Sequence, residues 1–223
     1  MSPSGIRKRV AVLISGRGSN MQALVNAAAA PEFPADIAIV ISNRPDAPGL
    51  QWAAENGIAT AALDHKAYPD RAAFDAELHK TLEAADIDLV AHAGFMRILT
   101  ATFVSKWQGR MINIHPSLLP LFPGLDTHAR AIAAGVKIAG CTVHFVTAEL
   151  DLGPIIAQAA VPVAAHDTPD TLAARILKAE HKIYPQALEW VAAEHVTIET
   201  AGSARFGTAE LDAQLISPAI VGS

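Results

Sequence analysis

Cysteine is almost absent from this chain of 223 residues, which contains Cys141 alone. A single cysteine excludes an internal disulfide and fits a reducing compartment, so we expect a cytoplasmic protein. No spacing of histidine, cysteine and acidic residues is typical of a zinc site, and we expect no metal. Apolar runs are short: none approaches the roughly 18 residues of a membrane span, and Val10–Ile14 is too short for a signal peptide. We therefore expect no association with a membrane.

Charged residues are scarce as well, at 17% of the chain, and their formal balance is 17 − 22 = −5. No basic run is longer than Arg7–Arg9, which argues against a nucleic-acid partner. Hydrophobic residues make up 51% of the sequence. A chain of this length and composition can bury a substantial core as one sizeable domain and is not expected to be disordered.

In the first half of the chain, short apolar runs alternate with segments of helical spacing. Five runs are typical of strands buried on both faces: Val10–Ile14, Ile37–Ile41, Ile58–Leu63, Ile87–Ala91 and Met111–Ile114. Helices are predicted between them, from a cap at Ser19 or Asn20 through Ala28, and over Ala47–Asn56, Arg71–Ala84 and Thr102–Trp107. This alternation predicts an α/β fold with a doubly wound, mostly parallel sheet.

The second half has a different pattern. Two long β-type runs separated by a short polar turn, Gly140–Thr147 and Ile155–Val163, predict an antiparallel hairpin that extends the sheet. A long helix from Thr168 to about Ala193 should kink or break at Tyr184, because Pro185 follows. The remaining predicted elements are a helix over Asp126–Ala134 and short β-like pieces at Val196–Ile198 and Ala204–Phe206.

The turn Ser15–Asn20 joins the first predicted strand to the first helix and contains two glycines. Backbone N–H groups at such a helix start can bind a phosphate. The spacing matches neither the dinucleotide fingerprint nor the Walker A loop. Phosphate binding and an ordinary strand-to-helix turn therefore both stay open.

Asn113 and His115 lie at the end of the fifth predicted strand, one residue apart, so they point to the same face. The carboxyl ends of parallel strands are where open α/β sheets bind ligands. A carboxamide donor beside an imidazole can stabilise an oxyanion and move protons. This pair favours an enzyme over a purely structural strand end.

Asp151 lies in the turn between the two long β-type runs, beside Gly153. A carboxylate at this point can pair with His115 and favour the protonated imidazole. It can equally do no more than stabilise the turn. The sequence pattern leaves these two interpretations open, and it leaves the role of His144 open too.

Five stretches, in this order, make the chain similar to a known family: Val12–Asn20, Ala93–Leu99, Ile112–Pro120, Gly140–Val146 and Glu149–Pro154. Over about residues 7–200 the chain resembles the phosphoribosylglycinamide formyltransferases, the folate-dependent glycinamide ribonucleotide transformylases of purine synthesis. The resemblance implies a Rossmann-like formyltransferase fold. It implies one domain over residues 1–223, with a phosphate-binding half (about 7–115), a folate-binding and hairpin half (about 116–200) and a tail (201–223).

The resemblance also implies the reaction and its site. A formyl group would pass from the co-substrate 10-formyltetrahydrofolate to the amine of 5-phosphoribosylglycinamide, in a monomer or homodimer whose partners are these small molecules. The implied catalytic residues are Asn113 and His115, which stabilise the oxyanion, and Asp151, which holds His115 protonated. The implied ribonucleotide-binding residues are Gly18, Ser19, Asn20, Leu177, Lys178, Ala179 and Glu180. The implied folate-binding residues are Arg71, Met96, Arg97, Ile98, Leu99, Asn113, Thr147, Ala148, Glu149, Leu150 and Asp151.

Two positions depart from the family pattern. Ala148 replaces an acidic residue common in bacterial members, and Asp126 stands where histidine is frequent. Neither change removes a catalytic group, so we expect the activity to survive. Thr142 stands where the family has serine or threonine, and the Leu119–Pro120 peptide bond resembles one that is cis in the family.

Three alternatives share part of this pattern. Formyltetrahydrofolate hydrolases share the catalytic trio but carry an additional N-terminal domain. Methionyl-tRNA formyltransferases share it too but carry a basic C-terminal domain, and the length of this chain disfavours both. A non-catalytic nucleotide-binding module needs the glycine turn but not the Asn-x-His pair.

Overall fold

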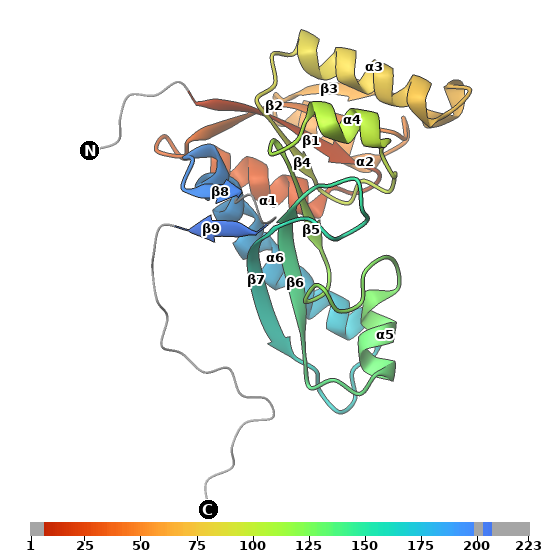
Figure 1. The fold of residues 1–223 in the computed structure, drawn as a ribbon, viewed down its shortest axis with the longest axis vertical. Coiled ribbons are helices and arrows are strands. Elements are labelled where there is room, and N and C mark those ends of the chain that lie inside the picture. The colour runs from red at the N-terminus through yellow and green to blue at the C-terminus, as the bar shows by residue number, and fades with distance from the viewer. Residues whose placement is uncertain (1–6, 199–202, 207–223) are drawn as a thin grey trace, which may run out of the picture.

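The computed structural model describes residues 7–198 and 203–206 and contains a seven-stranded sheet with the strand order β3-β2-β1-β4-β5-β6-β7 (Figure 1). Strands β1 to β5 pair in parallel, whereas β6 pairs antiparallel with both β5 and β7. The predicted α/β class, with an antiparallel hairpin that extends the sheet, is confirmed. The strands are β1 (Lys8–Ile14), β2 (Ala35–Ser42), β3 (Ala59–Ala62), β4 (Leu89–His92), β5 (Met111–His115), β6 (Ile138–Phe145) and β7 (Ile155–Pro162).

Helices fill the connections between these strands. Each predicted element is present, with ends displaced by one or two residues where they differ. The helices are α1 (Ser19–Ala28), α2 (Pro48–Glu55), α3 (Arg71–Ala84), α4 (Ala101–Lys106), α5 (Thr127–Ala133) and α6 (Pro169–Ala192), with a short 3-10 helix η1 (His65–Ala67) after β3.

Helices cover both faces of the sheet and create two cores (Figure 1). On one face α1 and α6 pack over side chains such as Val12 and Ile112. On the other face α3 and α4 pack over the residues adjacent to these on the same strands, such as Leu13 and Met111. Successive strand side chains point to opposite faces. The unbroken apolar runs in the sequence therefore match a sheet that is buried on both sides.

Helix α6 is continuous from Pro169 to Ala192, with Pro185 inside it. The predicted break at Tyr184 is wrong. An internal proline costs a helix about 3 kcal/mol, but three neighbouring side chains, Tyr184, Ala187 and Leu188, are fully buried against the sheet. Their burial outweighs the lost hydrogen bond, since one large apolar side chain alone contributes about 1.5–3 kcal/mol.

After α6, β8 (Val196–Ile198) and β9 (Ala204–Phe206) pair as a separate antiparallel sheet. The predicted tail beyond residue 206 lies outside the described residues. The division of the chain into a phosphate-binding half and a folate-binding half stays a prediction. Within residues 7–198 and 203–206, no helix combines the length and the apolar character that a membrane crossing needs.

Candidate active site

A row of polar side chains crosses the middle of the sheet. Strand pairing sets His92 of β4 beside Asn113 of β5, and Asn113 beside His144 of β6. Val90 precedes His92 by two residues and Met111 precedes Asn113 by two residues, so each pair points to the same face of the sheet. Val90 and Met111 belong to the core under α3 and α4, and the polar side chains therefore lie on that face. We call His92, Asn113 and His144 the polar row. It adjoins the point between β1 and β4 where the strand order reverses, which is where sheets of this kind bind ligands.

His144 holds the carboxamide of Asn113. The Nδ2 atom of Asn113 lies 3.1 Å from His144 Nε2, and His144 Nδ1 lies 2.9 Å from the carbonyl oxygen of Phe145. Burial lowers the pKa of His144, which favours a neutral ring. With the ring proton on Nδ1, His144 donates to Phe145 and accepts from Asn113. One N–H of the Asn113 amide then remains for a substrate.

The sequence pattern did not find this contact. Alternation along one strand gave only the side of the sheet to which His144 points. The missing signal is the antiparallel register of β5 and β6, which sets His144 opposite Asn113.

His115 and Asp151 lie in contact. His115 Nδ1 is 3.5 Å from Asp151 Oδ2, and the two side chains are 7% and 8% exposed. His115 Nε2 is 3.0 Å from the carbonyl oxygen of Phe122. An oxygen atom therefore lies beside each of the two ring nitrogens. The predicted contact between Asp151 and His115 is therefore present, and the catalytic roles of the pair stay predictions.

The loop between β6 and β7 brings Asp151 to His115 and is fixed at several points. The backbone N–H of Gly124 donates to Asp151 Oδ2 at 2.8 Å. Phe145 N–H donates to the carbonyl oxygen of Pro154 at 2.9 Å. Between these contacts Gly153 passes so close to Phe145 that an added Cβ would lie 1.7 Å from its carbonyl oxygen. Only glycine fits there, and its small size brings the loop back across the sheet.

The residues after His115 are held by Thr142, which faces His115 in the strand register. Thr142 Oγ1 donates to the carbonyl oxygen of Ser117 at 2.7 Å and accepts the N–H of Leu119 at 3.0 Å. The Leu119–Pro120 bond is cis, as the resemblance implied. A hydroxyl on β6 is therefore what orders the turn that follows the Asn-x-His pair.

The glycine turn after β1 leaves its helix uncapped by a side chain. Gly18 is the N-cap of α1, with φ of 68°, and no side chain caps the helix. The predicted cap by Ser19 or Asn20 is wrong, because the left-handed backbone at Gly18 starts the helix one residue earlier. The first N–H groups of α1 consequently face outward without a side-chain acceptor, as an anion site requires.

Helices α1 and α6 meet at this turn. Asn20 Nδ2 donates to Glu180 Oε2 at 2.7 Å, which joins the two segments that the resemblance assigned to the ribonucleotide. Glu180 is buried, and burial raises its pKa. Asn20 Oδ1 is buried and has no hydrogen-bond partner within the described part of the chain.

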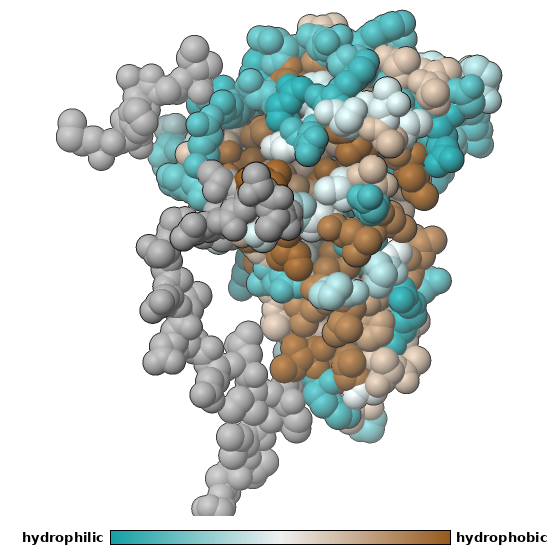
Figure 2. All heavy atoms as spheres, in the orientation of Figure 1, coloured by the Kyte–Doolittle hydropathy of each residue, from teal (hydrophilic) through white to brown (hydrophobic). Residues whose placement is uncertain are grey.

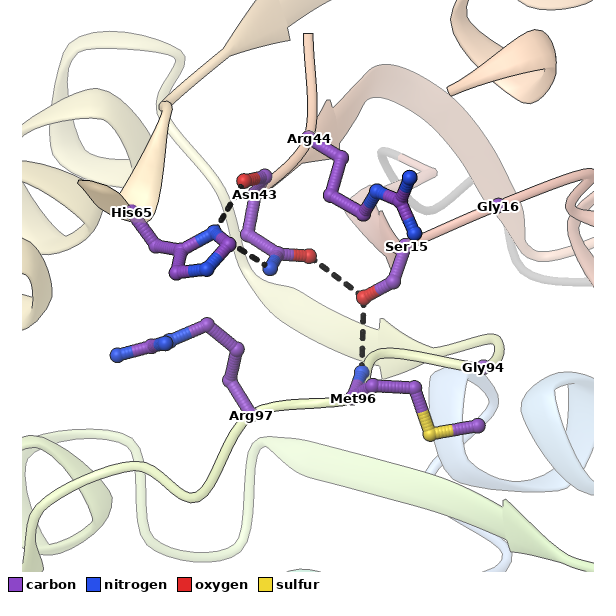
Figure 3. A pocket seen from close by; sticks show the side chains of 8 residues that line it. All are labelled: Ser15, Gly16, Asn43, Arg44, His65, Gly94, Met96 and Arg97. Atoms are coloured by element: carbon purple, nitrogen blue, oxygen red, sulfur yellow. Dashed lines mark hydrogen bonds between the residues drawn. The ribbon is translucent and has the colours of Figure 1, made fainter. Parts of the chain in front are cut away.

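A cavity of about 310 Å³ opens beside this turn (Figure 3). Ser15 links its walls, because its Oγ accepts the N–H of Met96 at 2.8 Å and donates to Asn43 Oδ1 at 2.5 Å. The lining residues come from the loops after four parallel strands: Ser15, Gly16, Asn43, Arg44, His65, Gly94, Met96 and Arg97.

Arg97 brings positive charge to the cavity. Its guanidinium stacks 5.1 Å from the centre of the Phe74 ring, and its Nε is buried without a hydrogen-bond partner in the described residues. Met96 and Arg97 were expected at the site from the resemblance, whereas Asn43, Arg44 and His65 were not. The signal for Asn43 and Arg44 was the polar turn that closes the second predicted strand.

Apolar side chains surround the same edge of the sheet. On the face shown in Figure 2, apolar residues gather over the middle and lower part of the molecule, where Figure 1 has β5, β6, β7 and their loops. The loops that follow β4, β5 and β6 also contain exposed large apolar side chains, namely Met96, Ile98, Leu121, Leu125, Leu150 and Leu152. Such a patch beside a cavity is typical of a ligand surface.

Other residues implied by the resemblance lie apart from the cavity or at its margin. Arg71 is exposed at the start of α3 and does not line the cavity, and Ala148 is exposed in the β6–β7 loop. Asp126 has a φ of 57° directly before α5 and lies two residues from Gly124, which holds Asp151. Among residues 7–198 and 203–206, no group of three or more His, Cys, Asp or Glu side chains is arranged to hold a metal ion.

Comparison with known proteins identifies the class. The chain matches the formyl transferase family model over residues 8–188 and therefore belongs to this family, which confirms the resemblance noted in the sequence. Phosphoribosylglycinamide formyltransferase of Escherichia coli (strain K12) is 48% identical over 183 residues, 82% of this chain and 86% of the relative. The crystal structure of glycinamide ribonucleotide transformylase 1 from Symbiobacterium toebii superposes with a TM-score of 0.87 at 48% identity, covering 90% of this chain and 94% of the other.

Similar domains also occur inside longer proteins. The trifunctional purine biosynthetic protein adenosine-3 of Bos taurus is 52% identical over 192 residues, 86% of this chain. The match covers 19% of that protein, so the chain corresponds to less than a fifth of this relative's length.

Proposed function

We propose that this chain transfers a formyl group from 10-formyltetrahydrofolate to the amine of 5-phosphoribosylglycinamide. The observation that carries the proposal is that Asp151 lies beside both His115 and His144, and that His144 in turn contacts Asn113. An amide donor, an imidazolium and a buried carboxylate are the groups that an acyl transfer through an oxyanion needs. The names of the similar proteins support the choice of substrates.

In the proposed reaction the amine nitrogen attacks the formyl carbon, and the carbonyl electron pair moves onto oxygen. The remaining N–H of the Asn113 amide donates to this oxyanion. The electron pair of the oxyanion then re-forms the carbonyl while the bond from carbon to folate N10 breaks and its electron pair stays on N10. The proton lost by the amine reaches N10 through solvent beside Asp151.

His115 acts mainly through its charge in this scheme. Its two nitrogen atoms already lie beside protein oxygens, the carbonyl of Phe122 at 3.0 Å and the carboxylate of Asp151 at 3.5 Å. The cation stabilises the developing negative charge from nearby, and Asn113 supplies the direct hydrogen bond. Asp151 stabilises the protonated ring in turn.

The substrates are assigned to the two sides of this centre. The ribonucleotide phosphate fits the uncapped N-terminal turn of α1 at Gly18–Asn20, and Leu177–Glu180 lie beside it through the bond between Asn20 and Glu180. The folate ring fits between Met96–Leu99 and Thr147–Asp151, whose exposed apolar side chains would cover it. Its carboxylates fit the cavity that contains Arg44 and Arg97.

One assay separates this proposal from its alternatives. The protein is mixed with 10-formyltetrahydrofolate, with and without 5-phosphoribosylglycinamide, and both the folate product and the formylated ribonucleotide are measured. Formyl transfer that requires the ribonucleotide supports the proposal. Loss of formyl from folate without the ribonucleotide supports a hydrolase. Binding of the ribonucleotide with no change in folate supports a nucleotide-binding module. The oligomeric state, monomer or homodimer, stays a prediction that sedimentation tests.

A further inference from the structure

His92 is the member of the polar row that the proposed reaction does not use. His92 is 6% exposed, and its ring atom Nε2 is buried without a hydrogen-bond partner among the described residues. Phe95 packs edge-on against the ring, with the centroids 5.6 Å apart. Burial lowers the pKa of His92 to about 3, so the ring is neutral in ordinary buffers. A buried polar atom without a partner is costly and needs an explanation.

The neighbour of His92 on β5 also has an unused polar atom. His92 faces Asn113 in the parallel register of β4 and β5. Neighbouring strands lie about 4.8 Å apart, and paired residues point to the same face. Asn113 Nδ2 is bound to His144 on the opposite side, while Asn113 Oδ1 has no hydrogen bond within the described residues. An orphaned imidazole nitrogen and an orphaned amide oxygen thus lie on adjacent strands of the candidate site.

We propose that His92 is a positioning residue whose Nε2–H donates to Asn113 Oδ1 when substrates are bound, so that two imidazoles hold the carboxamide from both sides. The inference rests on the proposed formyl transfer.

The two histidines then have opposite hydrogen-bond roles. His144 Nε2 also has Asp151 Oδ1 3.9 Å away, and it acts as an acceptor when its Nδ1–H donates to Phe145, so that it accepts from the amide nitrogen of Asn113. His92 Nε2–H is a donor and binds only the amide oxygen. A flipped amide would break both bonds and would turn its oxygen toward the oxyanion, which it would repel. The pair therefore fixes the orientation in which Asn113 donates to the oxyanion.

Two substitutions at His92 test this role through the split between kcat and KM. His92→Leu removes the N–H, and we expect kcat to fall about tenfold, the value of one hydrogen bond of ordinary strength. KM for both substrates should change by less than about twofold, since no contact with substrate is lost. His92→Gln retains an N–H donor and should keep most of the kcat.

His79→Leu is the matched control. His79 lies on α3, away from the polar row, and its Nδ1 accepts from Trp107 Nε1 at 3.3 Å. This control should lower the melting temperature and leave kcat unchanged. His92→Leu should do the reverse, because it removes an atom that has no partner.

A double-mutant cycle identifies the residue through which His92 acts. In the Asn113→Ala background, His92→Leu should have no further effect on kcat, because the amide it positions is gone. An equal loss of kcat in both backgrounds overturns the proposal. So does an unchanged kcat in the single variant, or a raised KM for the folate alone, which would mean that His92 contacts the folate directly.

A measurement without turnover separates this inference from the reaction itself. The side-chain amide resonances of Asn113 are followed by NMR with tetrahydrofolate and 5-phosphoribosylglycinamide bound. They should shift in His92→Leu and return toward the wild-type positions in His92→Gln. If they do not move, the contact is absent whatever the kinetics. If the wild-type protein shows no formyl transfer, the proposed reaction fails while the NMR result still decides the contact.

Discussion

Asp151→Asn removes one charge from the candidate site and almost no volume. The asparagine keeps an oxygen for the N–H of Gly124, which now donates to Asp151 Oδ2 at 2.8 Å. The attraction between the carboxylate and a protonated His115 is lost, although the loop should hold its place. The variant therefore tests the charge of Asp151 separately from its position.

The expected loss follows from the distance between the two groups. Opposite unit charges 3.5 Å apart attract each other by 332/(20 × 3.5), or about 5 kcal/mol, at an effective dielectric constant of about 20. Burial of both groups offsets part of this attraction. If half remains, about 2.4 kcal/mol is lost from the stabilisation of the transition state, and kcat should fall about sixtyfold.

Initial rates at saturating substrate concentrations measure this effect. Asp36→Asn is the matched control, since it removes the same charge from an exposed pair with Arg7 at the opposite end of the sheet. A folded Asp151→Asn protein with near-normal kcat would refute the role given to Asp151.

Three further variants probe other contacts. Burial raises the pKa of Glu180, which means that the folded chain favours the protonated carboxyl. The stability that this protonated form contributes is lost as pH rises above the ordinary pKa of 4.5. Glu180→Gln should therefore be the more stable protein in urea at neutral pH, yet bind the ribonucleotide less tightly; equal stability would contradict the first part. Tyr184→Phe loses the hydroxyl that donates to the His92 carbonyl oxygen at 2.9 Å and should lower the free energy of unfolding by about 1–3 kcal/mol with kcat unchanged. Gly153→Ala forces a Cβ to 1.7 Å from the Phe145 carbonyl oxygen, so kcat should fall sharply while ribonucleotide binding by calorimetry persists. Full activity in Gly153→Ala would show that the loop tolerates displacement.

The elements of the fold followed from the sequence because each carries its own periodic signal. Arg71–Ala84 has apolar residues at helical spacing and forms α3 with these same bounds. Local signals failed where packing decided the outcome. Pro185 should end a helix by backbone chemistry, but the burial of its neighbours keeps α6 continuous. Gly18 starts α1 through a left-handed backbone, which residue preferences for capping side chains did not anticipate.

Only part of the site could be predicted from the sequence, because the remaining contacts join separate segments of the chain. Asn113 and His115 could be paired because they share one strand, where alternation fixes their common face. Strand register sets both His144 and His92 beside Asn113, and register is a property of two segments that no single pattern contains. Asp151 needed the resemblance to a family before its contact with His115 could be preferred over a structural turn.

The two kinds of catalytic group are also held in different ways. Asn113 and His115 are fixed by β5, which is hydrogen-bonded to a strand on each side. Asp151 lies on a loop that begins beside β5, where the N–H of Val146 donates to the carbonyl oxygen of Met111 at 2.9 Å. The loop is held at Asp151 by the N–H of Gly124. The oxyanion donor is therefore as rigid as the sheet, whereas the contact between Asp151 and His115 depends on a few loop contacts. Changes to the loop should weaken that contact first and reach Asn113 only through His144, whose Nε2 lies 3.9 Å from Asp151 Oδ1.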